Sequence, residues 1–189
     1  MSGFFYKKHL NHIFLYYRKI KTIKMKKLLY LSLTILLVSF TNGTSGISNP
    51  KSVTDAENPV YIADNGITIK AKEWATIGAT GTIGPHTYTV VNEEMLREML
   101  ANEEDVTKIA TSKVTDMSTM FYGAETFNQS IGNWDLSKVT TVHSMFYGAT
   151  SFNQDLSAWD LDAVTDCAKF SYDTPQWSMP KPVFTNCKP

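Results

Sequence analysis

The chain has 189 residues, enough for one domain of ordinary size rather than two. Its formal net charge of zero hides an uneven distribution: eight of the 18 Lys and Arg residues fall within the first 27 positions, whereas residues 47–189 carry 10 basic and 18 acidic side chains. An acidic folded part excludes a nucleic-acid-binding surface, which needs clustered Lys and Arg to neutralise phosphates.

Residues 1–46 have the pattern of an export signal. The stretch MKKLLYLSLTILLVSF starts at Met25, and two lysines precede an apolar run from 28 to 40. That run has the length of a signal-peptide core and is shorter than a membrane-spanning helix. We predict that translation starts at Met25 and that the signal is cleaved, which leaves no membrane span in the mature chain. An uncleaved signal anchor is the alternative. A linker is predicted over 47–58.

Residues 59–113 are predicted to form an N-terminal cap that contains a β-hairpin, a strand and a helix. The pair Asn65-Gly66 lies between two alternating runs and is a strong hairpin signal. The segment TYTVV at 87–91 favours a further strand. Asn92 is followed by two glutamates, a pattern typical of a helix start, and we expect this helix to run to about Ala101.

Residues 114–163 contain two copies of a 25-residue repeat. VTDMSTMFYGAETFNQSIGNWDLSK is followed by VTTVHSMFYGATSFNQDLSAWDLDA, and 13 of the 25 positions are identical. A third copy begins at residue 164 and becomes irregular, so 164–189 is predicted to be a partial repeat and C-terminal cap whose prolines prevent regular structure. A period of this length is typical of solenoids, in which stacked repeats share one core.

Within a copy, apolar residues recur three, four and seven apart over 117–124, which predicts a short helix. Gly123 can end that helix in the left-handed conformation, and the mixed pattern after Phe127 favours a short strand. The predicted fold is therefore an α/β solenoid. It would be a short leucine-rich-repeat-like coil stack with one short helix and one short strand per repeat, an N-terminal hairpin and helix cap, and an irregular C-terminal cap.

Four residues are predicted to have structural roles. Trp134 and Trp159 occupy one repeated apolar position and are expected to form a buried ladder, although an aromatic binding platform is the alternative. Asn128 and Asn153 are expected to stack and satisfy backbone groups through their amides, although a polar recognition strip is also open.

The predicted binding surface lies where the repeats face outward or differ. Tyr122 and Tyr147 precede a glycine, lie outside the apolar set and are expected to be exposed. The variable pairs are Glu125-Thr126 in the first copy and Thr150-Ser151 in the second. A partner is expected to contact these six residues.

The sequence offers no catalytic constellation. Beyond the signal region the histidines are His86 and His143, and His143 occupies a variable repeat position. No nucleophile triad, phosphate loop or zinc motif is present, so we predict no enzyme activity, no cofactor and no metal. A set of aspartates could form a calcium-binding face, or each could hydrogen-bond its own backbone; these are Asp135, Asp155, Asp160, Asp162 and Asp166.

Cys167 and Cys187 are the two cysteines of the chain. In an exported protein an even count favours a disulfide, which would close a loop of about 20 residues. Two free buried thiols or a metal site are the alternatives.

The repeat MFYGATSFNQDLSAWDL followed by VT resembles that of the BspA-like leucine-rich-repeat surface proteins of bacteria. The segments NGITIKAKEW, LREMLAN and TSKVTDM resemble that family's N-terminal cap, and DTPQW and SMPKPVFTNC its C-terminal end, so the resemblance covers about 58–189. Members often carry more repeats, and some carry a lipid-modified cysteine that this chain lacks.

The resemblance implies an exported, non-enzymatic protein that adheres to host, matrix or cell-surface molecules. We therefore predict a secreted or bacterial cell-surface binding module whose partner is an extracellular protein. A carbohydrate-binding module that uses the exposed aromatic rings is the alternative, with a glycan as the partner.

Overall fold

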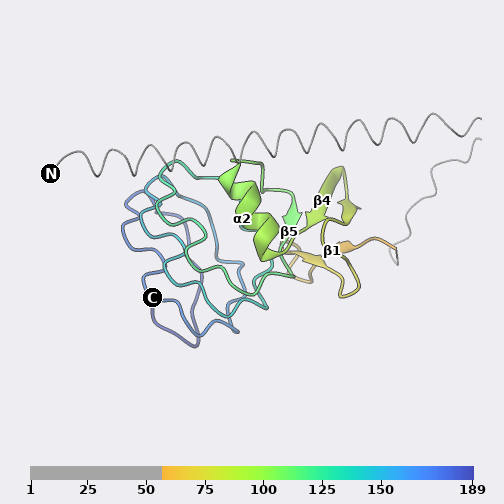
Figure 1. Ribbon diagram of the computed structural model, residues 1–189. Helices are drawn as coiled ribbons and strands as arrows, with labels where there is room; N and C mark the ends of the chain where they lie inside the picture. Colours follow the sequence, from red (N-terminus) through yellow and green to blue (C-terminus); the bar gives the residue numbers. More distant parts are fainter. Residues whose placement is uncertain (1–56) are drawn as a thin grey trace, which may run out of the picture. The chain divides into compact units, whose positions relative to one another are not determined.

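The computed structural model describes residues 57–189 (Figure 1). The predicted signal region, the proposed start at Met25 and most of the predicted linker lie outside the described residues.

Two small sheets form the N-terminal part of the described chain. Strands β1 (Val60–Ile62) and β2 (Ile69–Ala71) pair antiparallel, and their turn contains Gly66 with φ +70°, as the Asn65-Gly66 hairpin signal predicts. The second sheet has the order β3-β4-β5, in which β3 and β4 pair antiparallel and β4 and β5 pair parallel. These strands are β3 (Thr80–Ile83), β4 (His86–Val90) and β5 (Ile109–Ala110).

The helix α2 (Glu93–Ala101) connects β4 to the segment that leads into β5 (Figure 1). Asn92 caps its start, because the Asn92 Oδ1 accepts a hydrogen bond of 3.0 Å from the Met95 backbone N–H. Leu96 is fully buried and joins the main apolar core. The helix that the Asn92 pattern predicts is therefore confirmed.

The predicted α/β solenoid is wrong for the described residues. Between 111 and 189 the backbone forms turns and two isolated parallel bridges, Asp116 with Thr141 and Thr141 with Asp166, but no helix and no strand. The regular elements of the described chain all precede this part, as two small sheets and one short helix. The expected helix over 117–124 and the strand after Phe127 do not form.

Left-handed residues explain the missing helix. Thr119, Ser144 and Lys169 occupy the same repeat position and have φ of 53°, 50° and 56°, so a right-handed helix cannot pass through them. Backbone N–H groups then bond to the neighbouring copy instead of four residues back along their own chain. The Phe121 N–H, for example, donates to the Met145 carbonyl at 2.8 Å.

The copies nevertheless lie side by side and share one core. We call residues 114–138 the first copy, 139–163 the second copy and 164–189 the third copy. The rings of Phe121 and Phe146 are parallel at 5.0 Å between centroids, and both side chains are buried. Matching apolar surfaces at each interface remove area from water, worth about 25 cal/mol per Å².

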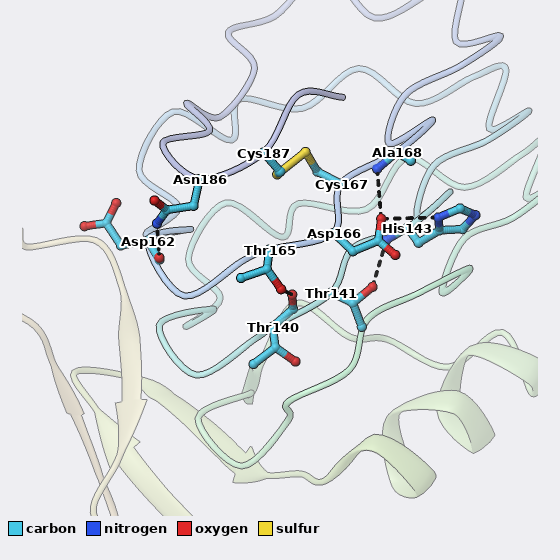
Figure 2. The surroundings of a disulfide bond; sticks show 10 residues. All are labelled: Thr140, Thr141, His143, Asp162, Thr165, Asp166, Cys167, Ala168, Asn186 and Cys187. Atoms are coloured by element: carbon cyan, nitrogen blue, oxygen red, sulfur yellow. Dashed lines mark hydrogen bonds and ion pairs between the residues drawn. A yellow bond between two sulfur atoms is a disulfide. The ribbon is translucent and has the colours of Figure 1, made fainter.

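The C-terminal tail is fastened to the copies by a disulfide (Figure 2). Cys167 and Cys187 are bonded with their Cα atoms 6.0 Å apart, which removes the free-thiol and metal alternatives. Beside it, Asn186 Nδ2 donates to the Asp162 carbonyl at 2.7 Å and Thr185 Oγ1 donates to the Asp162 carboxylate at 3.1 Å. The tail thus packs on the second copy despite its irregular backbone.

A buried carboxylate fastens the N-terminal part to the first copy. Asp135 is 4% exposed and accepts hydrogen bonds from Ser112 Oγ at 2.5 Å and from Ser137 Oγ at 2.7 Å. Ser112 Oγ also accepts a bond from the Ala71 N–H of β2, and Lys70 lies 3.5 Å from Asp135. Burial by itself would raise the pKa of Asp135, but these hydroxyl and backbone hydrogen bonds and the lysine charge lower the pKa below its ordinary value.

Candidate binding surface

Three tyrosines form a stacked column across the three copies. The rings of Tyr122 and Tyr147 lie 4.9 Å apart at an interplanar angle of 9°, and those of Tyr147 and Tyr172 lie 5.1 Å apart at 22°. We call Tyr122, Tyr147 and Tyr172 the tyrosine column. Each tyrosine occupies the same repeat position, immediately before the residue at which the backbone turns left-handed (Gly123, Gly148 and Asp173).

The column exposes ring edges rather than a flat platform. Parallel rings at these distances turn their faces toward one another, so the faces of Tyr147 are both covered. Tyr122 and Tyr172 are 58% and 61% exposed, and each stacks on another aromatic ring on one face. The surface therefore offers hydroxyl groups and ring edges along its length, with an open ring face at each end.

Tyr172 is absent from the sequence prediction although the period could have found it. It lies 25 residues after Tyr147, but the third copy reads SYD where the others read FYG. Asp173 takes the glycine position with φ +57° and thus keeps the same turn. The residues on either side of Tyr172 differ from those of the other copies, although the backbone turn is the same.

The variable pairs flank the column in sequence. Glu125, Thr126 and Ser151 are exposed and Thr150 is half-buried. The Ser151 N–H donates to the Glu125 carbonyl at 3.1 Å, and Thr150 Oγ1 lies 3.4 Å from the same oxygen. The structure thus brings Glu125, Thr150 and Ser151 together at the junction of two copies.

The asparagines and tryptophans bond across the copies. The Asn128 side chain accepts from the Asn153 N–H at 2.9 Å, and Asn153 accepts from the Ser178 N–H at 2.9 Å. Trp134 and Trp159 are buried, and their indole N–H groups each donate at 3.1 Å to the backbone carbonyl 28 residues earlier. Neither tryptophan contributes to the exposed surface.

A pocket of about 540 Å³ opens beside the column, where α2 meets the first copy. The C-terminal part of α2 and the loop after it form one wall, and the first copy forms the floor. The lining residues are Arg97, Leu100, Ala101, Glu103, Glu104, Met120, Phe121, Tyr122, Ala124, Thr126, Phe127, Asn128 and Gln129. Sequence reasoning missed this pocket.

The pocket exists because α2 covers the first copy less completely than the first copy covers the second. Phe127 is half-buried, whereas the equivalent Phe152 is fully buried. Ala124 likewise is half-buried where Ala149 is fully buried. The apolar floor is therefore core surface of a repeat that has no preceding repeat of the same kind.

The charged groups of the pocket differ in whether they already form hydrogen bonds or ion pairs within the protein. Arg97 donates to Glu93 at 2.8 Å and to the Ser118 carbonyl at 3.0 Å, so its guanidinium is already engaged. Burial would raise the pKa of Asp116 nearby, but hydrogen bonds from Ser118 and the charge of Arg97 lower that pKa. Glu103 is exposed and forms no ion pair with the other described residues. The pocket therefore has an apolar floor and an acidic rim.

The remaining polar candidates have local partners. The aspartate carboxylates at 135, 155, 160 and 166 each accept a hydrogen bond from the backbone N–H two residues later, as the backbone alternative predicts. His143 is half-buried, and its Nδ1 lies 3.4 Å from Asp166 Oδ1 (Figure 2). Residues 57–189 contain no group of three or more His, Cys, Asp or Glu side chains placed to hold a metal. No helix in that range combines the length and apolar character that crossing a bilayer requires.

The described residues thus define a small repeat protein that displays a tyrosine column beside a pocket. Residues 91–182 match the sequence family described as "Mycoplasma protein of unknown function, DUF285". The match begins just before α2 and includes the first two copies, and it spans slightly under half of the chain. Comparisons with curated proteins and with solved structures gave no match.

Proposed function

We propose that this protein is an exported, non-catalytic binding module that contacts a partner protein outside the cell or at its surface. The main observation that supports this proposal is the tyrosine column. Tyrosine supplies a large contact area with few rotatable bonds and a hydroxyl group, which is why it is enriched at protein interfaces. Three such side chains aligned along one edge form a ready contact surface.

Export is supported by three observations. The Cys167–Cys187 disulfide suits an oxidising compartment, because cytosolic thiols are kept reduced. The matched family and the resemblance to bacterial surface repeat proteins agree with an extracellular or surface location. The signal pattern of residues 1–46 points the same way.

A pull-down from solubilised cell-surface and matrix extract tests the proposal. The wild-type protein is compared with the double variant Tyr122→Ser, Tyr172→Ser, which removes both exposed rings and leaves the buried core intact. The expected result is at least one protein retained by the wild type and lost with the variant. Equal retention by both, or no retained protein at micromolar concentration, would contradict the proposal.

Carbohydrate binding is the second candidate function. Sugars stack on open aromatic faces, and the column leaves such a face at Tyr122 and at Tyr172. A glycan array should then show signal that falls with Tyr122→Ser or Tyr172→Ser. Tyr147→Ser should matter less, since both of its faces are covered. An array without signal removes this candidate.

A further inference from the structure

The first copy has an open hydrogen-bonding edge. In the second copy, the carbonyls of Met145 and Tyr147 accept from N–H groups of the first copy at 2.8 and 2.7 Å. The third copy repeats this pattern with the second. The equivalent carbonyls of the first copy, those of Met120 and Tyr122, accept no hydrogen bond from the described residues.

Two backbone donors are open at the same edge. In the second copy, the Ser151 N–H donates to the first copy at 3.1 Å and the Asn153 N–H donates to it at 2.9 Å. The equivalent N–H groups of Thr126 and Asn128 have no acceptor among the described residues. The edge therefore has two unpaired acceptors followed along the chain by two unpaired donors.

The helix α2 causes this opening. It occupies the place that a preceding copy would take, but its backbone N–H groups are used within the helix and cannot reach the first copy. A side chain of α2 replaces one of the missing backbone hydrogen bonds. Arg97 Nη2 donates to the Ser118 carbonyl, whereas the equivalent carbonyl of the second copy, that of His143, accepts from the Thr119 N–H. Met120, Tyr122, Thr126 and Asn128 all line the pocket, so the open edge faces it.

The floor of the pocket contains an aromatic ring that is only partly covered: Phe127 stacks on Phe121 of its own copy at 4.3 Å between centroids but remains half-buried. Phe152 lies over one side of Phe127, with centroids 6.1 Å apart and planes 7° from parallel. On the other side no aromatic residue of α2 takes the equivalent place, and Phe127 lines the pocket. The way the first copy packs on the second, with Phe127 beside Phe152, thus shows how a peptide with an aromatic side chain could fit on the first copy.

We propose that the pocket binds an extended peptide segment of a partner protein, with an aromatic side chain against Phe127 and backbone groups paired to the open edge. This inference rests on the proposed binding function and specifies the partner. Adding a strand-like segment to an unpaired edge is an established mode of peptide recognition. The pocket volume of about 540 Å³ suits one side chain with its adjoining backbone.

The negative charge of the rim favours a basic residue next to the aromatic residue of the peptide. The exposed Glu103 lies on the rim without an ion pair from the described residues, and residues 47–189 carry 18 acidic against 10 basic side chains. An adjacent Lys or Arg in the peptide would meet Glu103 and be drawn to the acidic protein. The partner segment therefore combines an aromatic residue with a neighbouring basic residue.

Selection from phage-displayed random heptapeptides against the purified, disulfide-bonded protein tests this inference. The expected consensus is an aromatic residue adjacent to Lys or Arg. A synthetic peptide of that consensus is then titrated by fluorescence anisotropy. Ala101→Phe fills the pocket from an exposed position at the end of α2, and Glu103→Lys reverses the rim charge; each should weaken binding at least about tenfold.

Matched variants provide the controls. Glu94→Phe adds the same ring at an exposed α2 position outside the pocket, and Asp64→Lys reverses the charge of an exposed residue in the β1–β2 turn, also outside the pocket; both should change the affinity less than about twofold. No enriched peptide, a consensus without an aromatic residue, or equal binding by Ala101→Phe and wild type would overturn the inference. If extract proteins are still retained through the tyrosine column in that case, the proposed function stands alone.

Discussion

Asp135 shows how a single residue can join two parts of the chain. Its carboxylate is buried, yet hydrogen bonds from Ser112 and Ser137 and the nearby Lys70 keep its pKa low. A carboxyl group with a lowered native pKa stabilises the fold above the unfolded value, about 3.9, and this contribution is lost as the pH falls through the native pKa. Asp135 therefore contributes to acid sensitivity.

Asp135→Asn tests that contribution. The amide keeps the shape but loses the charge and mismatches the serine donors, so the free energy of unfolding at pH 7 should fall by about 1–3 kcal/mol. The difference from wild type should shrink at pH 3, because the wild-type carboxyl then approaches its neutral form. Urea denaturation at both pH values measures this. Asp160→Asn, the exposed equivalent in the second copy, should show a smaller loss at pH 7.

Lys169 holds a strained backbone conformation. Its φ of +56° is unfavourable for a residue with a Cβ, and its side chain is exposed. Lys169→Gly should raise the free energy of unfolding by about 0.5–1 kcal/mol, since glycine adopts this conformation without a steric penalty. Lys169→Ala keeps the Cβ and should give no such gain. A Lys169→Gly protein that unfolds at lower urea than the alanine variant would contradict this account.

At the scale of elements, the copies approach each other closely where a side chain is missing. A Cβ at Gly132 would lie 2.6 Å from the Asp155 carbonyl oxygen, a backbone atom that cannot simply rotate away. The first and second copies can therefore pack at this point only with glycine.

Gly132→Ala should force the copies apart and lower the free energy of unfolding by about 1–3 kcal/mol. Thermal or urea denaturation measures the loss. Ser157, at the equivalent position of the second copy, already accommodates a Cβ, so Ser157→Ala should cost only about 1 kcal/mol for its hydrogen bond to Asp155. Equal costs for the two variants would show that the close approach is unimportant.

Some of these elements could be predicted from the sequence and others could not. Asn92 and Asn65-Gly66 specify α2 and the β1–β2 turn through local chemistry. The apolar spacing over 117–124 resembles a helix because tight turns that bury every third or fourth residue have the same pattern. The left-handed Thr119 carries no such signal, so the helix was predicted wrongly.

The candidate binding surface was predictable to a similar extent. The repeat places Tyr122 and Tyr147 at one position outside the apolar set, which predicts that both are exposed. Tyr122 is exposed, whereas Tyr147 is half-buried between the rings of Tyr122 and Tyr172. That their rings stack on one another requires the spacing between copies, which the sequence does not contain. The pocket depends on incomplete cover by α2, a tertiary property that no local pattern of 93–129 indicates.

At the scale of the whole molecule, the disulfide holds the end of the chain over the core. Cys167 is buried, and Trp177 and Phe184 of the tail pack around Phe170 at centroid distances of 5.9 and 5.0 Å. The disulfide lowers the conformational entropy of the unfolded chain and thereby stabilises the folded state in which these rings pack together. The tail thus protects apolar surface of the third copy that would otherwise face water.

Reduction of the disulfide should destabilise the protein. The bonded cysteines are 20 residues apart, and loop entropy assigns such a closure about 3 kcal/mol. Urea denaturation with and without dithiothreitol measures the change, and mass spectrometry should show a gain of two hydrogens on reduction. Cys187→Ser should reproduce the loss and be insensitive to reductant. An unchanged urea midpoint after complete reduction would contradict this role for the bond.

The tyrosine column is the surface that we propose contacts the partner protein. Site-specific photo-cross-linking tests it most directly: benzoylphenylalanine replaces Tyr122, Tyr172 or, as a control, the exposed Asp64 in the β1–β2 turn, and each protein is irradiated with cell-surface extract. We expect both column positions to capture the same protein and position 64 not to capture it. Capture only at position 64, or no adduct at either column position, would contradict it.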